Sequence, residues 1–408
     1  MRRVVVTGMA GISSLGDNWP AIREAMHAGR TGVKLIHGWH HLTDLGNKIG
    51  SPADWFRHEG VFHRQQMRSM GRVAAMSVKA AEAAIASAGL ADHPILKTGR
   101  TGVACGSSYG SVQPTVDFFN FLETGKASGL NATSYIRMMS HTSPVNLAVF
   151  FGLQGRIITT SSACTSGSQG IGGAFEAIQA NRADVMLAGG AEEFSATMTM
   201  VFDRLLALSS RKEDAATAVR PFDKTRDGLV IGEGAGMLIL EEREHALARG
   251  ATPLAEVVGY ATNCDGSHIS HPSEETQAHV MRLALETAGI QASEVGFISG
   301  HGTGTVAGDI VESKATHAVY GSRVPFHTLK GHFGHTLGAC GALEAWLGIE
   351  MMNEGLLTAT ANLKDVDPKC AELDYVMGAP RKVDAEYFVS NNFAFGGINT
   401  SLVIRRAA

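Results

Sequence analysis

The chain has 408 residues, of which 44% are hydrophobic and 18% charged, and its formal net charge is −4. This composition supports a substantial buried core and excludes intrinsic disorder, while the lack of a long basic run argues against nucleic acid as the main partner. The five cysteines are odd in number and widely spaced, which indicates reduced thiols rather than a disulfide framework or a zinc ribbon. No apolar run has the length of a signal peptide or a bilayer span, so we expect a soluble cytoplasmic protein.

The predicted elements alternate between strands and helices in both halves of the chain. Strands are predicted at 3–7, 184–188, 237–241, 254–260, 295–299, 388–392 and 400–405. Helices are predicted at 20–28, 70–88, directly after 164, 279–289 and 337–353. This alternation indicates an α/β fold with two halves, 1–251 and 252–408, whose glycine loops follow strands and meet at one end.

Four stretches have competing interpretations. The spacing of His37, His40 and His41 suits metal ligands, but we expect a solvated loop. Arg64, Arg68 and Arg72 recur every four residues and are expected on one helix face, either solvated or as a docking patch for an acidic partner. The aromatic and methionine-rich segment 112–141 suits an interface, a pocket wall or plain core. The Gly-Glu-Gly-Ala-Gly run at 232–236 lacks the Lys-Ser/Thr of a phosphate loop, so we expect close backbone approach instead.

Cys164 lies among small hydroxyl and glycine residues, after an apolar stretch and before a helical pattern. This context predicts a tight turn at the start of a helix, where free backbone N–H groups and the helix dipole favour a thiolate. A buried structural cysteine is the competing interpretation. The choice depends on residues elsewhere in the chain.

Two glycine loops supply the histidines His301 and His335, and Lys330 lies five residues before the second. Together with the Cys164 turn, they indicate a Cys-His-His constellation. Two imidazole N–H donors suit a reaction in which negative charge develops on a carbonyl oxygen, such as an enolate. A metal site built from Cys164, His301 and His335 is the alternative, although zinc cysteines usually occur in pairs.

Four motifs in order carry a resemblance that covers essentially the whole chain. They are Ala-Cys-Thr-Ser-Gly at 163–167, His-Gly-Thr-Gly-Thr at 301–305 with Asp309 and Glu312, Lys330 with Gly334-His335, and Asn-Phe-Ala-Phe-Gly-Gly-Ile-Asn at 392–399. With them the chain resembles the β-ketoacyl-[acyl-carrier-protein] synthases of the KAS I/II type, in the thiolase superfamily. The resemblance implies a thiolase-like fold of two pseudo-repeated α/β halves in five layers, αβαβα.

The resemblance also implies a mechanism. Cys164 takes an acyl chain from acyl carrier protein, and His301 and His335 stabilise the enolate formed when the malonyl group on a second carrier loses carbon dioxide. The backbone N–H groups of Cys164 and Phe395 form the oxyanion hole. Lys330 and Glu344 orient the histidines. No cofactor or metal is implied, because the phosphopantetheine arm belongs to the carrier.

Further residues match positions with supporting roles in the family. Thr303 and Thr305 match residues that bind the phosphopantetheine arm, Phe395 matches a gate, and Phe202 its partner. Tyr109 matches a position that reaches the acyl pocket across a dimer, where its bulk disfavours long saturated chains. Candidates for docking the carrier are Arg64, Arg68, Arg72, Arg211 and Lys212.

The resemblance leaves the pathway and the partner subunit open. The stretches 161–169, 330–346 and 391–400 resemble ketosynthases of bacterial aryl polyene clusters, which would imply a heterodimer with a chain-length-factor paralogue that extends polyenyl chains. A homodimer in fatty acid or polyketide synthesis is the other arrangement. A non-enzymatic, carrier-binding length-setting subunit is a third alternative, which the presence of Cys164 argues against.

Overall fold

A mixed sheet runs through the whole molecule. The loops that hold the candidate catalytic residues lie at one end of this sheet. The computed structural model describes residues 1–407. In the described chain the sheet has 11 strands in the order β12-β10-β9-β14-β15-β8-β1-β7-β6-β4-β5. Their bounds are β1 Val4–Ile12, β4 Thr101–Gly106, β5 Ile157–Thr159, β6 Val185–Glu192, β7 Gly234–Glu242, β8 Ala255–Cys264, β9 Val295–Ser299, β10 Pro325–His327, β12 Asp374–Tyr375, β14 Tyr387–Ala394 and β15 Ile398–Arg406. Two small sheets pair β2 Lys34–Leu35 with β3 Ile49–Gly50 and β11 Leu356–Leu357 with β13 Arg381–Lys382.

The two halves repeat one another. In the first, β1-β7-β6-β4-β5 are joined by two antiparallel and then two parallel pairings. In the second, β8-β15-β14-β9-β10 follow the same order and the same directions. The antiparallel pairing of β1 with β8 joins them, with Val5 opposite Glu256. The pseudo-repeat predicted from the sequence is confirmed; the boundary at residue 251 stays a prediction and falls in the connection between α8 Arg243–Ala248 and β8.

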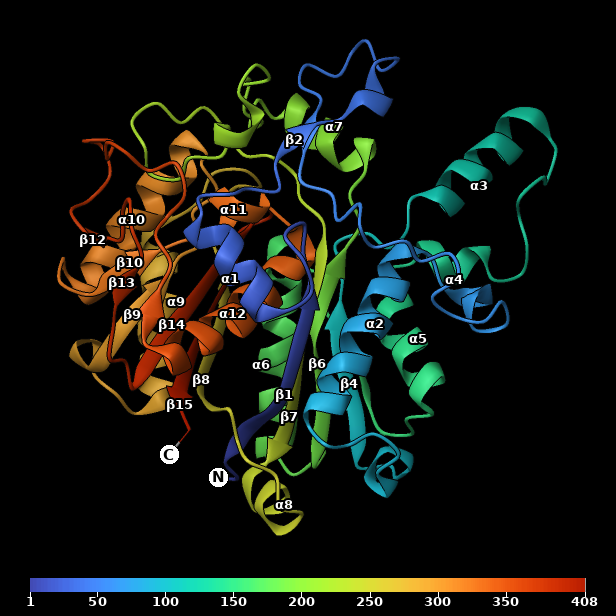
Figure 1. Cartoon of the computed structure of the whole chain (residues 1–408), viewed down its shortest axis with the longest axis horizontal. Helices are drawn as coiled ribbons and strands as arrows, with labels where there is room; N and C mark the ends of the chain where they lie inside the picture. The colour runs from blue at the N-terminus through green and yellow to red at the C-terminus, as the bar shows by residue number, and fades with distance from the viewer. Residues whose placement is uncertain (408) are drawn as a thin grey trace.

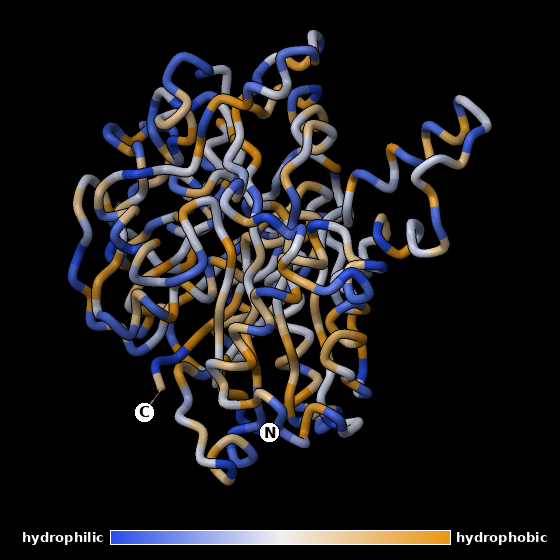
Figure 2. The backbone as a smooth tube through the Cα atoms, turned by 45° about the vertical axis from the view of Figure 1, so that its right-hand side comes forward, coloured by the Kyte–Doolittle hydropathy of each residue, from blue (hydrophilic) through white to orange (hydrophobic). Residues whose placement is uncertain are grey.

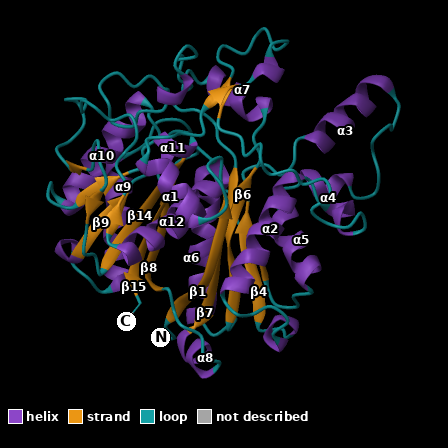
Figure 3. Ribbon diagram, in the orientation of Figure 1, coloured by secondary structure: helices purple, strands orange, loops and turns teal. Residues whose placement is uncertain are grey.

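Helices form three layers around the sheet (Figures 1 and 3). α6 Ser166–Gln179 and α12 Cys340–Glu354 lie in the middle and contact strands of both halves, whereas α2 Arg72–Ser87 with α5 Thr142–Phe151 and α9 Glu274–Ala288 with α10 Val306–Tyr320 cover the outer faces. Each layer boundary is an apolar cluster, as burial of one face of every element requires. The remaining described helices are α1 Trp19–His27, α3 Gln113–Thr124, α4 Ser134–Met138, α7 Ala196–Arg204 and α11 Lys330–Phe333, with short 3-10 turns between them.

Glycine in the central layer brings the two halves into contact. A Cβ atom on Gly190 would lie 2.2 Å from the carbonyl oxygen of Gly338, and one on Gly236 would lie 2.6 Å from the backbone of Ala342. Any larger residue would force β6 and β7 away from the second half, and with them the Cys164 turn. The close approach predicted for the 232–236 run is therefore confirmed.

One helical arm stands out from the body. α3 projects away from the sheet (Figure 1), and hydrophobic residues are spread along this arm (Figure 2). Leu122 is 78% exposed and Phe119 60%, so the interpretation of 112–141 as core is wrong for this arm. His37, His40 and His41 are exposed, as predicted for a solvated loop.

The three arginines predicted on one helix face do not share one. Arg64 lies in a turn and Arg68 in a short 3-10 helix, and α2 begins only at Arg72. The four-residue spacing of these arginines therefore does not correspond to one continuous helix. Among residues 1–407, no helix is both long and apolar enough to cross a membrane.

Candidate active site

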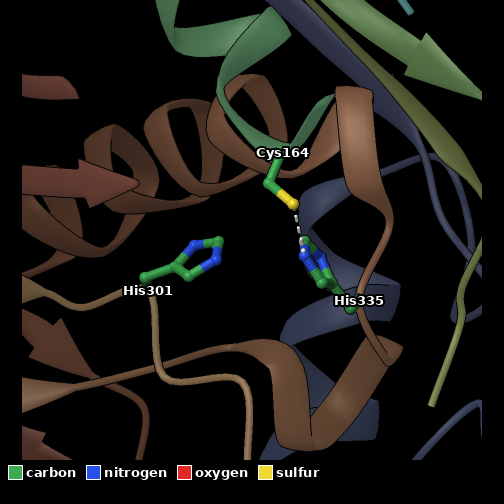
Figure 4. A group of neighbouring side chains, drawn as sticks. All are labelled: Cys164, His301 and His335. Carbon is green, nitrogen blue, oxygen red and sulfur yellow. Dashed lines mark hydrogen bonds between the residues drawn. The ribbon is translucent and has the colours of Figure 1, made fainter. Parts of the chain in front are cut away.

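Cys164, His301 and His335 come from three loops that meet at one end of the sheet (Figure 4). Cys164 lies in the 3-10 turn Ala163–Thr165, directly before α6. Ala163 has φ +51°, in the left-handed region that few non-glycine residues adopt. Strained backbone of this kind persists only where the surrounding structure enforces it, and it occurs often at functional sites. The predicted turn at the start of a helix is confirmed.

His335 contacts the thiol directly. Its Nε2 lies 3.0 Å from Sγ of Cys164, and its Nδ1 accepts the backbone N–H of Leu337 at 3.3 Å. Because Nδ1 acts as an acceptor, the neutral ring carries its proton on Nε2, which points at the sulfur. His335 is therefore a donor to the reacting centre, with a tautomer set by the backbone.

His301 faces the same space from the other side. Its ring centroid lies 5.1 Å from that of His335, in an edge-on arrangement. Nδ2 of Asn392 lies 3.4 Å from Nδ1 of His301 and donates to Oε2 of Glu344 at 2.6 Å, so the amide nitrogen is a donor and Nδ1 an acceptor. Nε2 of His301 is then a second N–H donor. Glu312 anchors the loop by accepting the backbone N–H of His301 at 2.6 Å.

A buried ion pair lies behind the histidines. Nζ of Lys330 lies 2.5 Å from Oε1 of Glu344, and both side chains are 2–3% exposed. Through Asn392 this pair is connected to His301. Lys330 and Glu344 thus lie next to the histidines, and the orienting role stays a prediction.

Burial dominates the electrostatics of the site. It raises the pKa of Cys164 to about 11, although the backbone N–H groups of Phe395 and Cys164 and the charge of Lys330 all act to lower it. Burial and then Lys330 hold the pKa of His335 well below its ordinary value, and the same causes, with His335, lower the pKa of His301. The N–H groups predicted to favour a thiolate do act to lower the pKa of the thiol, but burial outweighs them, and burial also favours the neutral form of both imidazoles.

The same three residues were the candidate metal site. In the described chain they form the one group of three such ligands whose donor atoms lie within 4.8 Å of one another. The donor set does not fit a cation well, because a thiol with a raised pKa must ionise to bind a metal and the positive charge of Lys330 acts on all three residues.

A cavity of about 530 Å³ opens from Cys164 to the surface. Its walls include both histidines and the predicted Thr303, Thr305, Phe202 and Phe395. The hydroxyl oxygens of Thr303 and Thr305 lie 2.9 Å apart. The cavity thus has both polar threonine and apolar phenylalanine side chains in its wall, and a buried nucleophile.

Comparisons with known proteins place this geometry in a family. Residues 1–246 match the family model "Beta-ketoacyl synthase, N-terminal domain" and residues 254–364 the model "Beta-ketoacyl synthase, C-terminal domain". The chain belongs to the β-ketoacyl synthase family. The protein is 35% identical to a 3-oxoacyl-[acyl-carrier-protein] synthase 2 of Vibrio cholerae, over 99% of both chains.

Solved ketosynthase structures have the same fold over the full chain. A β-ketoacyl synthase from Burkholderia phymatum is 50% identical with a TM-score of 0.98, covering 100% of both chains. The ishigamide ketosynthase/chain length factor is 32% identical with a TM-score of 0.91. A type II polyketide ketosynthase in complex with its acyl-carrier protein is 28% identical with a TM-score of 0.88. Both matches cover 100% of both chains. The thiolase-like α/β fold and the condensing acyltransferase activity follow from these relationships.

Not every residue predicted from the family reaches the ketosynthase cavity. The Tyr109 hydroxyl donates to Thr115 at 3.0 Å, and Tyr109 is not part of the cavity wall within this chain. Its role at the acyl pocket stays a prediction. Phe194 and Met198, which were not singled out from the sequence, pack against the apolar cluster that contains Cys164.

The predicted carrier-docking residues divide into two groups. Arg64, Arg68 and Lys212 are exposed. Arg211 is half-buried, donating to the Thr225 carbonyl at 2.7 Å. Arg72 is engaged internally: it pairs with the buried Glu233 at 2.6 Å and donates to two backbone carbonyls. Arg72 is therefore a structural residue and not a docking candidate, because its guanidinium makes four hydrogen bonds within the chain.

A buried carboxylate beside the ketosynthase site was not predicted from the sequence. Glu192, at the end of β6, accepts the backbone N–H groups of Ser108 at 2.8 Å and Gly338 at 3.0 Å, and also the Ser108 hydroxyl. Gly338 follows Leu337, which sets the His335 tautomer. Its signal was the Gly-Gly-Ala-Glu sequence that closes a buried strand, where a charged residue needs a reason.

Proposed function

We propose that Cys164, His301 and His335 carry out the decarboxylative Claisen condensation of a β-ketoacyl-acyl-carrier-protein synthase. The observation that carries the proposal is the Nε2–Sγ distance of 3.0 Å between His335 and Cys164 at the buried end of a cavity. Two neutral imidazoles beside a thiol suit this reaction better than a hydrolase, which needs a base positioned for water.

The first half-reaction loads the acyl chain. Sγ of Cys164 attacks the thioester carbonyl, and the new C–S bond replaces the bond to the phosphopantetheine sulfur, which leaves as a thiol with the cysteine proton. The backbone N–H groups of Cys164 and Phe395 hold the oxyanion in the tetrahedral intermediate. Since the thiol has a raised pKa, the N–H of His335 is needed to stabilise the sulfur as its negative charge develops.

The second half-reaction extends the chain. The malonyl group on a second carrier loses carbon dioxide, and the electron pair of the broken C–C bond forms an enolate whose oxygen accepts from Nε2 of His301 and His335. The enolate carbon attacks the acyl carbonyl on Cys164, a C–C bond forms, and the sulfur leaves. The product is a 3-oxoacyl group on the carrier, two carbons longer. Lys330 and Glu344 position the histidines.

The protein needs no cofactor of its own in this mechanism. The phosphopantetheine arm arrives on the carrier protein, and Thr303 and Thr305, on the cavity wall, are placed to hydrogen-bond its amides. No step requires a metal ion, in keeping with the poor fit of the Cys164, His301 and His335 donor set to a cation.

The partner subunit belongs to the proposal as well. The ishigamide relative is a ketosynthase/chain length factor pair, whereas other relatives are 3-oxoacyl-[acyl-carrier-protein] synthases by name. We favour a dimer through the projecting α3, whose exposed apolar side chains need a partner surface, with either a second copy or a paralogue. The aryl polyene pathway and cytoplasmic location remain part of this proposal. A length-setting subunit without activity is disfavoured by the complete Cys164, His301, His335 and Lys330 set.

The direct test is a condensation assay with purified protein, acyl-carrier and malonyl-carrier. One carbon dioxide and one 3-oxoacyl-carrier are expected per turnover, measured by gas release and by mass spectrometry of the carrier. Release of free malonate without carbon dioxide would contradict the proposal. Stoichiometric zinc in elemental analysis would favour the alternative of a metal site built from Cys164, His301 and His335.

A further inference from the structure

Side-chain hydroxyl groups donate to the backbone of the turn that carries Cys164. Around this turn, a serine or threonine hydroxyl bonds to the carbonyl oxygen three residues before it in the chain. The three bonds of this kind run from Thr165 to Ser162 at 2.8 Å, from Ser166 to Ala163 at 2.8 Å and from Ser168 to Thr165 at 3.1 Å. The carbonyl of Cys164 interrupts this series, because the residue three positions on is Gly167, which has no side chain.

The packing of the two halves explains why Gly167 supplies no hydroxyl. A Cβ atom at this position would lie 2.9 Å from the backbone nitrogen of Ala342 and 3.0 Å from the carbonyl oxygen of Gly338. Both of these atoms belong to the backbone of the second half, so a side chain would force the halves apart. A donor for the Cys164 carbonyl therefore has to come from elsewhere in the chain.

Cys340 supplies this donor from the second half. Its Sγ lies 3.1 Å from the carbonyl oxygen of Cys164, and because a carbonyl can only accept, the sulfur carries the proton. Burial holds the pKa of Cys340 well above its ordinary value, so this thiol stays protonated at neutral pH. The turn that holds the nucleophile is thus fixed by three hydroxyls of its own and one thiol from the other half.

The same thiol lies beside the groups that hold His301. Cys340 is the first residue of α12 and Glu344 follows one turn later, so both lie on one face of this helix. The amide nitrogen of Asn392 donates to Glu344 at 2.6 Å, which leaves its second hydrogen for Nδ1 of His301 at 3.4 Å and the sulfur of Cys340 at 3.8 Å. Cys340 therefore contacts both the backbone of the nucleophile and the amide beside His301.

The bond from Cys340 acts on the geometry of the nucleophile. It holds the peptide plane that follows Cys164, while the left-handed Ala163 precedes that residue. The same stretch of backbone directs Sγ toward Nε2 of His335 (Figure 4) and carries the Cys164 N–H proposed for the oxyanion hole. A rotation of this backbone would move both groups away from the reacting carbonyl, and small displacements of reacting groups lower rates strongly.

We propose that the thiol of Cys340 is a positioning residue for the nucleophile. It donates to the Cys164 carbonyl in place of the hydroxyl that Gly167 cannot supply, and so holds Sγ and the N–H of Cys164 in the geometry for acyl transfer. This inference rests on the proposed function and adds a residue to it. Cys340 acts through Cys164 and carries no acyl chain itself.

The test measures single-turnover acylation of Cys164 by acyl-carrier, followed by mass spectrometry, in the Cys340→Ala and Cys340→Ser variants. Alanine removes the donor, whereas serine keeps a donor of similar size. Cys340→Ala should lower the maximal acylation rate constant about fivefold, as loss of one weak hydrogen bond would, with an unchanged half-saturating carrier concentration. Cys340→Ser should stay within about twofold of the parent.

The matched control is Cys105→Ala, which removes an equally buried thiol from the outer apolar cluster around α2. Its acylation rate constant should equal that of the parent. Thermal melts of all three variants establish that each is folded at the assay temperature.

A second measurement needs neither a carrier nor an acyl group. The rate constant for alkylation of Cys164 by iodoacetamide, located by peptide mapping, should fall in Cys340→Ala and recover in Cys340→Ser. Without its donor, the negative end of the Cys164 carbonyl dipole would act unopposed on the thiolate that develops during alkylation.

Three results would overturn the inference. Unchanged acylation and alkylation of Cys164 in Cys340→Ala would show that the thiol does not position the nucleophile. Equal losses in Cys340→Ala and Cys340→Ser would assign Cys340 to packing alone. A raised half-saturating carrier concentration with an unchanged maximal rate constant would place the effect in carrier binding. If the parent were not acylated but alkylation followed the predicted pattern, the proposed function would fail while the contact between Cys340 and Cys164 stood, so the two failures can be told apart.

Discussion

Nζ of Lys330 lies 2.5 Å from Oε1 of Glu344, and neither side chain is more than 3% exposed. Buried pairs of this kind contribute little net stability when intact, but removing one partner leaves an uncompensated charge. The pair is nevertheless placed where it acts on the site: Glu344 holds Asn392, Asn392 lies beside His301, and Lys330 lowers the pKa of both catalytic histidines. A catalytic role explains the pair better than stability does.

Replacing Lys330 by methionine should therefore affect both stability and chemistry. We expect a loss of about 3–5 kcal/mol in the free energy of unfolding, because Glu344 is left unpaired. We also expect the acid limb in the pH–rate profile of malonyl decarboxylation to move to higher pH, since one influence that lowers the histidine pKa values is removed. Urea unfolding and decarboxylation rates check the two effects. Arg381→Ala, which breaks an exposed pair with Asp374, is the control and should cost no more than about 1 kcal/mol.

The neutral state of both histidines predicts the pH dependence of the parent protein. Because the pKa values of His301 and His335 lie well below 6.5, protonation removes their neutral form only at acidic pH. The rate of malonyl decarboxylation should then stay constant from pH 8 down to 6.5 and fall below that range. A midpoint near 6.5 would show that one of the rings titrates as an ordinary exposed histidine.

His301 should be needed for decarboxylation more than for acyl transfer to the thiol. It lies across the cavity from Cys164, whose direct partner is His335. His301→Ala is expected to reduce malonyl decarboxylation by about 100-fold or more, the usual loss on removal of an oxyanion donor, while acylation of Cys164 remains measurable. Normal carbon dioxide release from this variant would remove His301 from the proposed role.

Glu192 supplies a stability test in the neutral range. Burial raises its pKa to about 7 from an ordinary value of 4.5, despite hydrogen bonds from Ser108 and Gly338. A carboxyl with a raised folded-state pKa contributes stability that is present at low pH and lost as pH rises through the window from 4.5 to 7. Glu192→Gln should therefore gain stability relative to the parent by up to about 3 kcal/mol between pH 4.5 and 8. The exposed Glu372→Gln is the control, for which the difference in Tm should not change with pH.

The sequence could predict the local features that the chemistry needs. The strand at 295–299 has the predicted bounds, and the turn at Cys164 lies directly before a helix. Both follow from short-range patterns of apolar, glycine and hydroxyl residues, which limit the backbone conformations available. The prediction that His301 and His335 face the same sulfur came from the order of the family motifs and not from residue spacing. Spacing could not show it, because the sulfur and the histidines lie in different halves of the chain.

Other properties of the site depend on tertiary contacts and could not be predicted from the sequence. The spacing of Arg64, Arg68 and Arg72 resembled a helix face, yet Arg72 is bound by Glu233, 161 residues away in sequence. The thiol pKa was expected to fall at a helix start, but complete burial outweighs the nearby N–H groups. Cys340 shows no unusual local pattern in the sequence, and only its contact with the Cys164 carbonyl singles it out.

The central claim is that Cys164 carries the acyl chain during the reaction. Mass spectrometry of the protein after incubation with acyl-carrier measures this directly. We predict one added acyl mass, located by peptide mapping on the peptide that contains Cys164 and missing in Cys164→Ala, while the other buried thiols, Cys105 and Cys340, remain unmodified. An adduct on another residue, or one that persists in Cys164→Ala, would contradict the account.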